Sequence, residues 1–325
     1  MKGGLKRGPA ELALGVRAGD RRSLARAITL VESTRSEDEA QALELLRALL
    51  PFHTRGLRVG VSGPPGVGKS SLLERLGVHL VESGQRPAVL VVDPSSQRGA
   101  GSILGDKTRM VRLAREAAAY VRPSPSGDSN GGISRATGDV LMLCEVAGFS
   151  PSLVETVGVG QAETAVTNVV DVLLLLLEPG AGDELQGIKR GLNEWGDVIA
   201  VNKSDGARAE LARQTCAQFA AGLSSFRNGE SAAPVVCVSA LLGTGIADLW
   251  AALETRYREL EASGALQRKH REQRKADLYR RLAIALMRRF AHDARRQAEV
   301  RSIEQRVMSG ALLPAEAVEL LLQGD

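Results

Sequence analysis

Eight consecutive residues have the types and spacing needed to bind phosphate. They fit the pattern G-x-x-x-x-G-K-[ST] and are Gly63-Pro64-Pro65-Gly66-Val67-Gly68-Lys69-Ser70. Glycines let the backbone wrap closely around phosphate oxygens, and N–H groups at the start of a helix attract anions. We expect this loop and the following Ser71 to bind phosphates, with Lys69 reaching the β- and γ-phosphates and Ser70 ligating Mg²⁺. A predicted strand at 57–62 and a predicted helix at 71–83 flank the loop, which favours this interpretation over a chance glycine turn.

A second polar segment, Asn202-Lys203-Ser204-Asp205, ends a predicted strand at 197–202. A side-chain amide can bind guanine N7, and a carboxylate can accept from the guanine N1–H and exocyclic amine, which adenine does not offer in that pattern. The segment resembles the N-K-x-D guanine-specificity element of GTPases. The alternative is a polar strand end in which Asp205 opens the next helix.

Ser239 and Ala240 follow the next predicted strand, at 234–238. They resemble the S-A element whose backbone N–H contacts guanine O6. Small residues after a strand are common, so the pair is weak evidence alone. Its place at the next strand end puts it where the base should lie.

Two carboxylates end apolar strands on the same edge of the predicted sheet: Asp93 after 88–92 and Glu155 after 152–154. Mg²⁺ accepts one or two carboxylates and keeps several waters, so both residues are candidates for the metal site. The alternative role is to cap the strand end. Glu155-Thr-Val-Gly158 is placed like the D-x-x-G element of GTPases, and Gly158 would supply the N–H that senses the γ-phosphate.

Val159 stands where Ras-like GTPases place a water-orienting Gln directly after that glycine. A valine cannot orient water, and Gln161 lies two residues further on. We therefore predict slow intrinsic hydrolysis that a partner, or another loop, accelerates.

Short aliphatic runs must form the elements that position these residues. They occur at 57–62, 88–93, 152–155, 171–178, 197–202 and 234–238, and segments of helical length separate most of them. Runs that are apolar on both faces mark strands buried in a parallel sheet. Their alternation with helices predicts a doubly wound α/β domain of P-loop NTPase type, with helices on both sides of a mostly parallel sheet.

The two ends of the chain are predicted to be helical. Apolar residues recur at helical spacing between 8 and 50, and Pro51 ends that segment. After 262 there are no strand-like runs. We predict an N-terminal helical extension at 1–55, the nucleotide-binding domain at 56–262 and a C-terminal helical dimerisation arm at 263–325.

The C-terminal arm is strongly basic. Between Gly264 and Arg301 twelve Lys/Arg and four Asp/Glu give a net charge of +8, against +4 for the whole chain. Such a helix can capture nucleic acid, or its apolar stripe (Leu278, Leu282, Leu286 and Phe290) can pack on a second subunit. Aromatic residues are only 3%, so few side chains can stack on bases, and we predict a homodimer without nucleic acid binding.

Composition is that of a soluble globular protein, with 44% hydrophobic and 25% charged residues in 325. The longest aliphatic run, 172–177, is far shorter than the ~20 residues of a membrane span. The first ten residues lack the apolar region of a secretory signal. Three cysteines, Cys144, Cys216 and Cys237, fit a reducing compartment better than a disulfide framework, so we expect a cytoplasmic protein without membrane attachment.

Three longer stretches, at 92–110, 121–149 and 153–191, together resemble the MeaB/ArgK family, which includes the methylmalonic aciduria type A protein. The resemblance covers nearly the whole chain, including HREQ at 270–273. It implies a GTPase that acts as a chaperone of an adenosylcobalamin-dependent acyl-CoA mutase, gates cofactor loading, protects or reactivates the mutase, and forms a homodimer through its C-terminal helices.

The resemblance also implies further site residues. The loop 179–191 corresponds to the family's third switch, where Asp183, Gln186 and Lys189 would relay the nucleotide state or complete the hydrolytic site. Asp106 lies in the first switch and is a candidate for Mg²⁺ or water positioning. This chain departs from the family pattern by having Gly99, Ala100 and Ala162 at positions that usually carry Thr or Ser, Gly and Ser. If the missing hydroxyls order a switch in the family, switching in this chain is expected to be weaker or to use other residues.

Two rival functions remain at this point. One is a non-catalytic scaffold that holds the mutase while GTP or GDP is merely structural. The other is a kinase linked to amino-acid transport, the role behind an older family name. Multiple-turnover hydrolysis, or phosphate appearing on protein, distinguishes them.

Overall fold

The computed structural model describes the backbone of residues 8–93, 110–125, 136–156, 166–181, 196–224, 233–292 and 294–322. Five predicted site residues lie outside these ranges: Asp106, Gly158, Asp183, Gln186 and Lys189. The backbone of Asp93 is described but its side chain is not. The chain divides into two compact units, Met1–Lys269 and His270–Asp325. The predicted boundaries at 55 and 262 stay predictions.

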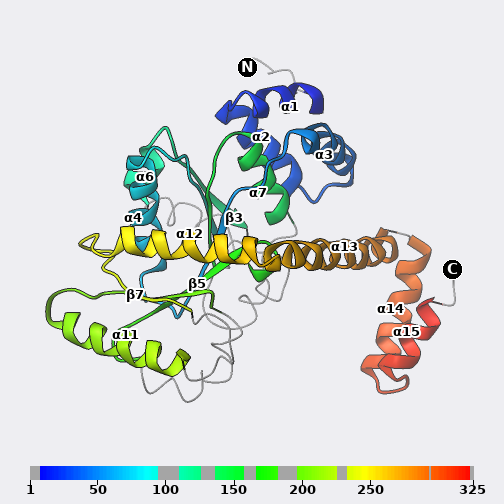
Figure 1. Ribbon diagram of the computed structural model, residues 1–325. Helices are drawn as coiled ribbons and strands as arrows, with labels where there is room; N and C mark the ends of the chain where they lie inside the picture. Colours follow the sequence, from blue (N-terminus) through cyan, green and yellow to red (C-terminus); the bar gives the residue numbers. More distant parts are fainter. Residues whose placement is uncertain are drawn as a thin grey trace. The chain divides into compact units, whose positions relative to one another are not determined.

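A parallel sheet forms the centre of the first unit (Figure 1). Its order is β3-β2-β4-β1-β5-β6-β7, and every described pairing between these strands is parallel. The strands are β1 (Arg58–Ser62), β2 (Ala88–Asp93), β3 (Tyr120–Pro125), β4 (Ser152–Glu155), β5 (Val172–Leu177), β6 (Val198–Val201) and β7 (Val235–Cys237). This confirms the predicted doubly wound α/β fold.

The edge strand β3 was missed by the sequence analysis. Its segment, YVRPSP, contains two prolines and an arginine instead of an aliphatic run. An edge strand pairs on one side only, here with β2, so it tolerates prolines that a central strand excludes. The central strand β5, by contrast, is buried at all six positions.

Helices cover both faces of the sheet because alternate strand residues point to opposite sides. Val89 and Val91 pack in one core with α4 (Lys69–Glu82), α6 (Val111–Arg115) and α12 (Ile246–Ala262). Ala88 and Leu90 pack in the other core with α1 (Pro9–Arg17), α2 (Arg21–Glu32), α3 (Ser36–Leu49) and α7 (Thr137–Val146). A smaller cluster joins β5 and β6 to α11 (Ala209–Ser224).

The described part of the N-terminal segment forms the helices α1, α2 and α3, as the apolar spacing between 8 and 50 predicted. Asp20 caps α2 by accepting from the N–H groups of Arg22 and Ser23. The short 3₁₀-helix η1 (Leu50–Phe52) contains Pro51 and follows α3 directly. Burial of Leu24, Ile28 and their neighbours in the second core attaches these helices to the sheet.

A buried charge network occupies the amino ends of the central strands. Glu145 on α7 accepts from Arg58 Nε at 2.8 Å and Nη2 at 2.6 Å, and its Oε2 lies 2.6 Å from His53 Nε2. Burial opposes ionisation of Glu145, but the hydrogen bonds from Arg58 and His53 outweigh it and hold the pKa of the carboxyl below its usual value. Asp171, just before β5, accepts from Arg55 Nη2 at 2.6 Å and from the Arg58 N–H at 2.9 Å.

The sequence led us to expect cysteines outside a disulfide framework, and for two of the three this expectation was wrong. Cys216 on α11 and Cys237 on β7 form a disulfide, with Cα atoms 6.5 Å apart. The two residues are 21 positions apart in sequence and come together only because α11 packs beside β7. Cys144 is free, and burial raises the pKa of its thiol to about 12.

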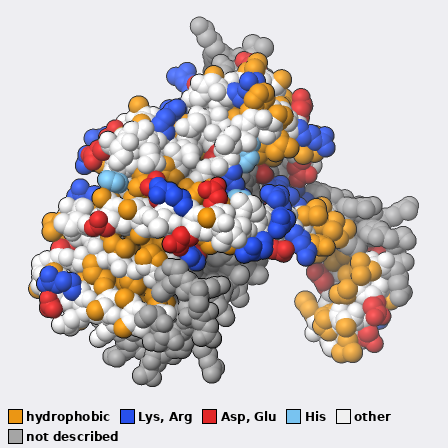
Figure 2. Space-filling view, viewed as in Figure 1, with side chains coloured by type: hydrophobic (Ala, Val, Ile, Leu, Met, Phe, Trp, Pro, Cys, Tyr) orange, Lys and Arg blue, Asp and Glu red, His pale blue; other side chains and the backbone are white. Residues whose placement is uncertain are grey.

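The second unit contains most of α13 (Ala265–His292), with α14 (Ala294–Met308) and α15 (Pro314–Leu322). Ile303, Leu312 and Ala317 form its small core. Along α13, the predicted stripe is exposed at Leu278, Leu282 and Leu286, and Figure 2 shows hydrophobic side chains at the surface of this unit. None of the helices in the described ranges is long and apolar enough to cross a membrane.

Candidate functional site

Five loops of the described chain meet at the carboxyl edge of the sheet. They follow β1, β4, β5, β6 and β7, and these five strands are consecutive neighbours in the sheet, in the order β4-β1-β5-β6-β7. In open α/β sheets the crevice at this edge is where ligands bind. The sheet thus brings together the predicted phosphate loop, Glu155, Asn202, Asp205 and the Ser239–Ala240 pair.

Close approach by neighbouring atoms requires two glycines of the 63–68 loop, Gly63 and Gly68. A Cβ on Gly63 would lie 2.3 Å from the Leu176 carbonyl oxygen, and one on Gly68 would lie 2.6 Å from Asn202 Nδ2. Gly68 also has a φ of +96° and caps α4 without a side chain. The loop therefore brings backbone N–H groups to the start of α4, where the helix dipole adds to their attraction for anions.

Lys69 lies across this loop. Its ammonium donates to the Gly63 carbonyl at 2.7 Å and to the Pro64 carbonyl at 3.1 Å, and the residue is only 8% exposed. The positive charge is thus held beside the loop whose backbone N–H groups the motif predicts to bind phosphate.

Ser70 and Glu155 form the oxygen pair of the site. The Ser70 hydroxyl donates to Glu155 Oε1 at 2.7 Å. Val91 of β2 lies opposite Glu155, so Asp93 follows two residues further toward the same edge. A hydroxyl and a carboxylate are hard oxygen donors of the kind Mg²⁺ prefers, so this pair fits the ion. Among the described residues no group of three or more His, Cys, Asp or Glu side chains could hold a metal.

Asn202 links the phosphate loop to the segment after β7. Its Nδ2 donates to the Val67 carbonyl at 2.8 Å, and its Oδ1 accepts from the Ala240 N–H at 3.0 Å. The residue is 2% exposed. A carboxamide carries two N–H donors, so one donor remains for a base.

Asp205 and Lys203 follow Asn202 at the end of β6 and make further side-chain contacts there. Asp205 Oδ2 accepts from the Ser239 hydroxyl, and Lys203 Nζ lies 2.6 Å from Glu178 Oε1. A carboxylate offers about four acceptor positions, so Asp205 keeps acceptors for the N–H groups of a base. Lys203 has a φ of +60°, a rare conformation for a residue with a side chain.

The sequence analysis missed three residues that position these loops. Arg75 on α4 donates to the Ala240 and Leu241 carbonyls at 3.0 and 2.7 Å. Glu178 pairs with Lys203, and Thr215 on α11 accepts from the Gly180 N–H at 2.9 Å. The spacing of neighbouring residues could not predict these three roles, because each contact joins residues that are 25 or more positions apart.

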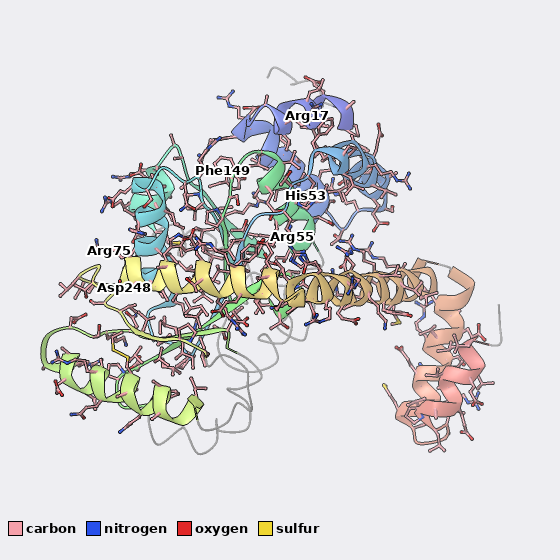
Figure 3. All side chains as sticks on the ribbon, viewed as in Figure 1. Arg17, His53, Arg55, Arg75, Phe149 and Asp248 are labelled. Atoms are coloured by element: carbon pink, nitrogen blue, oxygen red, sulfur yellow. A yellow bond between two sulfur atoms is a disulfide. The ribbon has the colours of Figure 1, made fainter. Side chains whose placement is uncertain are left out.

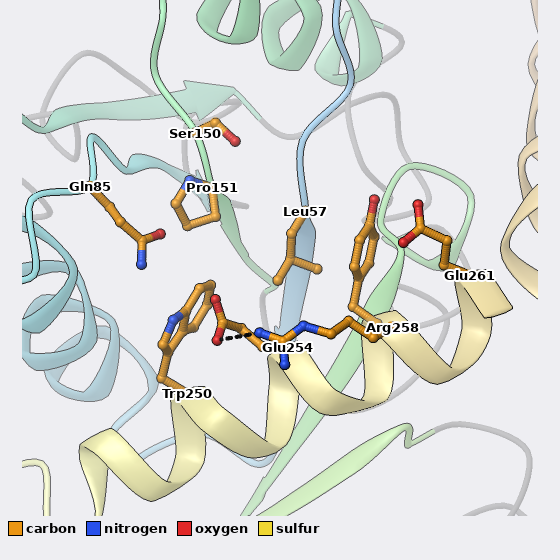
Figure 4. A pocket seen from close by; sticks show the side chains of 9 residues that line it. Leu57, Gln85, Ser150, Pro151, Trp250, Glu254, Arg258 and Glu261 are labelled. Atoms are coloured by element: carbon orange, nitrogen blue, oxygen red, sulfur yellow. Dashed lines mark hydrogen bonds and ion pairs between the residues drawn. The ribbon is translucent and has the colours of Figure 1, made fainter.

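A pocket of about 330 Å³ lies elsewhere (Figure 4). Leu57, Gln85 and Pro151 line it, and they precede β1, β2 and β4. Trp250 and Tyr257 of α12 complete its apolar wall. The pocket is therefore at the amino end of the strands, opposite the edge that carries the phosphate loop.

A parallel sheet with a glycine-rich phosphate loop after β1 and an N-K-x-D segment after β6 defines the P-loop GTPase class. The family model described as "Methylmalonyl Co-A mutase-associated GTPase MeaB" matches residues 24–295. The chain belongs to this family.

Similar proteins agree with this assignment. A "Probable GTPase" of Mycobacterium tuberculosis is 45% identical over 314 residues, covering 96% of this chain and 94% of its own. The "Methylmalonic aciduria type A homolog, mitochondrial" of Mus musculus is 40% identical, covering 96% and 78%. A solved structure described as "Crystal structure of LAO/AO transport system kinase" has a TM-score of 0.73 at 33% identity, covering 97% and 96%.

Proposed function

We propose that this GTPase is a chaperone of an adenosylcobalamin-dependent acyl-CoA mutase, methylmalonyl-CoA mutase or a close relative, and that it acts in the cytoplasm. Hydrolysis of GTP would gate cofactor loading and protect or reactivate the mutase. Membership of a family described as associated with methylmalonyl-CoA mutase, and similarity to a methylmalonic aciduria type A homolog, support this client.

The observation that carries nucleotide binding is the pair of hydrogen bonds made by Asn202. They hold the phosphate loop and the Ser239–Ala240 pair together, so that one nucleotide can touch both. The backbone of 63–68, with Ser71 after it, would bind the phosphates. Lys69 would exchange its two carbonyl acceptors for phosphate oxygens, which are stronger because they are charged.

We assign guanine selection to Asp205, Asn202 and the segment near Ala240. Asp205 would accept from N1–H and the exocyclic amine, Asn202 would donate to N7, and the backbone near Ala240 would donate to O6. Lys203, paired with Glu178, would lie beside the base. Because Ser239 already donates to Asp205, this carboxylate is held in a fixed orientation before a base arrives.

Ser70 and Glu155 would hold Mg²⁺, with Asp93 and Asp106 as further candidates. The ion, when bound, neutralises charge that develops on the transferred phosphoryl group. The residues themselves position the phosphates for in-line attack by water. We propose that Gly158 senses the γ-phosphate, and that Gln186 and Lys189 complete the site because Val159 cannot orient water. The intrinsic rate is then slow, and the partner raises it.

The nucleotide state would reach the mutase through loop 179–191. This loop follows β5, and its first residues are held by the Thr215–Gly180 hydrogen bond and flanked by Glu178. We assign 1–55 to a helical extension, 56–262 to the GTPase domain and 263–325 to a homodimerisation arm. No nucleic acid or membrane partner is proposed.

Lys69→Ala tests the assignment. We expect a loss of roughly 100-fold or more in GTP turnover, since one phosphate-binding cation disappears from the site. Arg213→Ala, which removes an exposed arginine of α11, is the control. Turnover and mutase protection are measured in the same mixture with purified mutase.

The outcomes separate the rival functions. Unchanged turnover in Lys69→Ala would refute the site. Mutase binding without multiple-turnover hydrolysis would favour a nucleotide-gated scaffold. Labelled γ-phosphate on protein instead of in solution would favour a kinase, the activity after which the similar solved structure is named. If the protein hydrolyses GTP but no acyl-CoA mutase changes the rate, the GTPase assignment stands and only the proposed mutase partner is refuted.

A further inference from the structure

Arg75 connects the helix that begins at the phosphate loop to the segment after β7. Its Nε donates to the Ala240 carbonyl at 3.0 Å and its Nη2 to the Leu241 carbonyl at 2.7 Å. The guanidinium is planar with donors in fixed directions, so two such bonds set both the place and the orientation of the carbonyls. Figure 3 shows Arg75 beside α4, near the start of α12.

The segment needs this support because its tip has little apolar packing. Leu241 and Leu242 are 71% and 63% exposed. Its other bonds are mostly internal: Gly243 N–H donates to the Ser239 carbonyl at 2.7 Å and Leu242 N–H to the Ser239 hydroxyl at 3.0 Å. Internal bonds fix the shape of a turn but not its distance from α4.

The geometry of one peptide links Arg75 to base recognition. The Ala240 carbonyl and the Leu241 N–H belong to the same planar peptide unit and point in opposite directions when it is trans. Holding the carbonyl on Arg75 therefore directs the Leu241 N–H away from Arg75. The neighbouring Ala240 N–H is fixed by Asn202. Two side chains from different elements thus orient consecutive N–H groups.

We propose that Arg75 is a positioning residue that sets discrimination at position 6 of the purine. By holding the Ala240–Leu241 peptide, Arg75 fixes the Leu241 N–H, which would meet guanine O6 beside the Ala240 N–H that Asn202 holds. This rests on the proposed function, which assigns the segment near Ala240 to O6. Recognition of the exocyclic 2-amine is assigned to Asp205, whose carboxylate is oriented by the Ser239 hydroxyl and not by a bond to Arg75.

The test uses GDP, 6-thio-GDP, in which sulfur replaces O6, and inosine diphosphate, which lacks the 2-amine. We expect Arg75→Ala to weaken GDP about 5- to 10-fold, the worth of about one hydrogen bond. The ratio of GDP to 6-thio-GDP affinity should shrink, and the ratio of GDP to inosine diphosphate affinity should stay constant. Arg75→Lys, a single point donor, should fall between Arg75→Ala and the unaltered protein.

The control is Arg213→Ala, which removes an exposed arginine paired with Glu210 on α11. It should change neither ratio. Equal losses for GDP and 6-thio-GDP in both Arg75 variants would mean that Arg75 contributes only charge or stability, and would overturn the proposal. If the unaltered protein does not distinguish GDP from 6-thio-GDP, the O6 assignment itself fails, and the proposal with it.

Discussion

Asn202 satisfies backbone groups of two different loops, and the site depends on such single side chains. Its bonds to the Val67 carbonyl and the Ala240 N–H make the phosphate loop and the base-recognition segment one unit. Asp205 is held in a similar way by Ser239. At the residue scale, the 63–68 loop, Asp205 and the Ser239–Ala240 pair are therefore linked without a nucleotide, which would lower the ordering cost of binding.

Asp205→Asn should change the preferred base from guanine to xanthine. The substitution replaces an acceptor-only carboxylate by an amide that also donates, and xanthine offers a carbonyl where guanine has its amine. Competition between GDP and xanthosine diphosphate for binding measures the change. We expect a reversal of preference, with Glu210→Gln, an exposed carboxylate on α11, leaving the preference for GDP intact.

An unaltered preference for GDP in Asp205→Asn would place the base contact elsewhere. Loss of binding to both nucleotides would instead indicate that the Asp205–Ser239 contact is needed to shape the site. Circular dichroism of the variant separates that result from global unfolding.

At the scale of elements, the two edges of the sheet have different chemistry. The carboxyl edge carries the glycine-rich loop at 63–68 and the residues proposed to recognise the base. The amino edge carries buried ion pairs, in which α7 contributes Glu145 and β1 contributes Arg58. Lys269 at the start of α13 donates to the Asp171 carbonyl at 2.7 Å, so the first residues of α13 are held at this same edge.

Glu145→Gln should lower the free energy of unfolding at neutral pH by about 3 kcal/mol, because it breaks a buried pair and leaves Arg58 without its anion. The pKa of Glu145 is lowered in the folded protein, so its ionised form stabilises the fold. That stabilisation is present above the usual carboxyl pKa of 4.5 and is lost as pH falls through the lower folded pKa.

Urea unfolding at several pH values measures this effect. The difference between Glu145→Gln and the unaltered protein should narrow as the solution is acidified below about pH 4.5. Glu210→Gln, at an exposed ion pair, should cost about 0.5 kcal/mol or less throughout. A difference that grows on acidification would show that Glu145 is not the stabilising anion.

At the scale of the whole molecule, the C-terminal unit has large apolar side chains that are exposed instead of buried in its small core. Leu278 and Leu282 are 63% and 49% exposed on α13, and Met308 is 84% exposed on α14. Exposed apolar stripes of this kind mark protein interfaces. The proposed homodimer would cover this stripe.

Replacing Leu278 and Leu282 together by Ser should convert a dimer to a monomer. Burying each leucine side chain at an interface contributes about 1.5–3 kcal/mol to the free energy of association, and serine loses this contribution. Light scattering after size-exclusion chromatography measures the mass. Ala276→Ser with Ala283→Ser adds the same hydroxyls on the other side of α13 and should leave the dimer intact. If the unaltered protein is a monomer, or if the Leu278/Leu282 variant is still a dimer, dimerisation through this stripe is contradicted.

Much of this protein was predictable because its motifs are local. The phosphate loop, the N-K-x-D segment and the aliphatic strands depend on spacings of a few residues, and the strands lie where their apolar runs predicted. The edge strand β3 and the Cys216–Cys237 disulfide were not predicted. An edge position tolerates atypical residues, and helix–strand adjacency leaves no sign in local spacing.

The sequence by itself determined which groups are present for phosphate, metal and base, and the order of the elements that carry them. Only the tertiary structure decided how these groups are held: Asn202 between two loops, Arg75 on the Ala240–Leu241 peptide, and Lys203 on Glu178. The reason is physical. Local spacing fixes backbone conformation and apolar faces, whereas a hydrogen bond between distant residues exists only after the sheet has brought its strand ends to one edge.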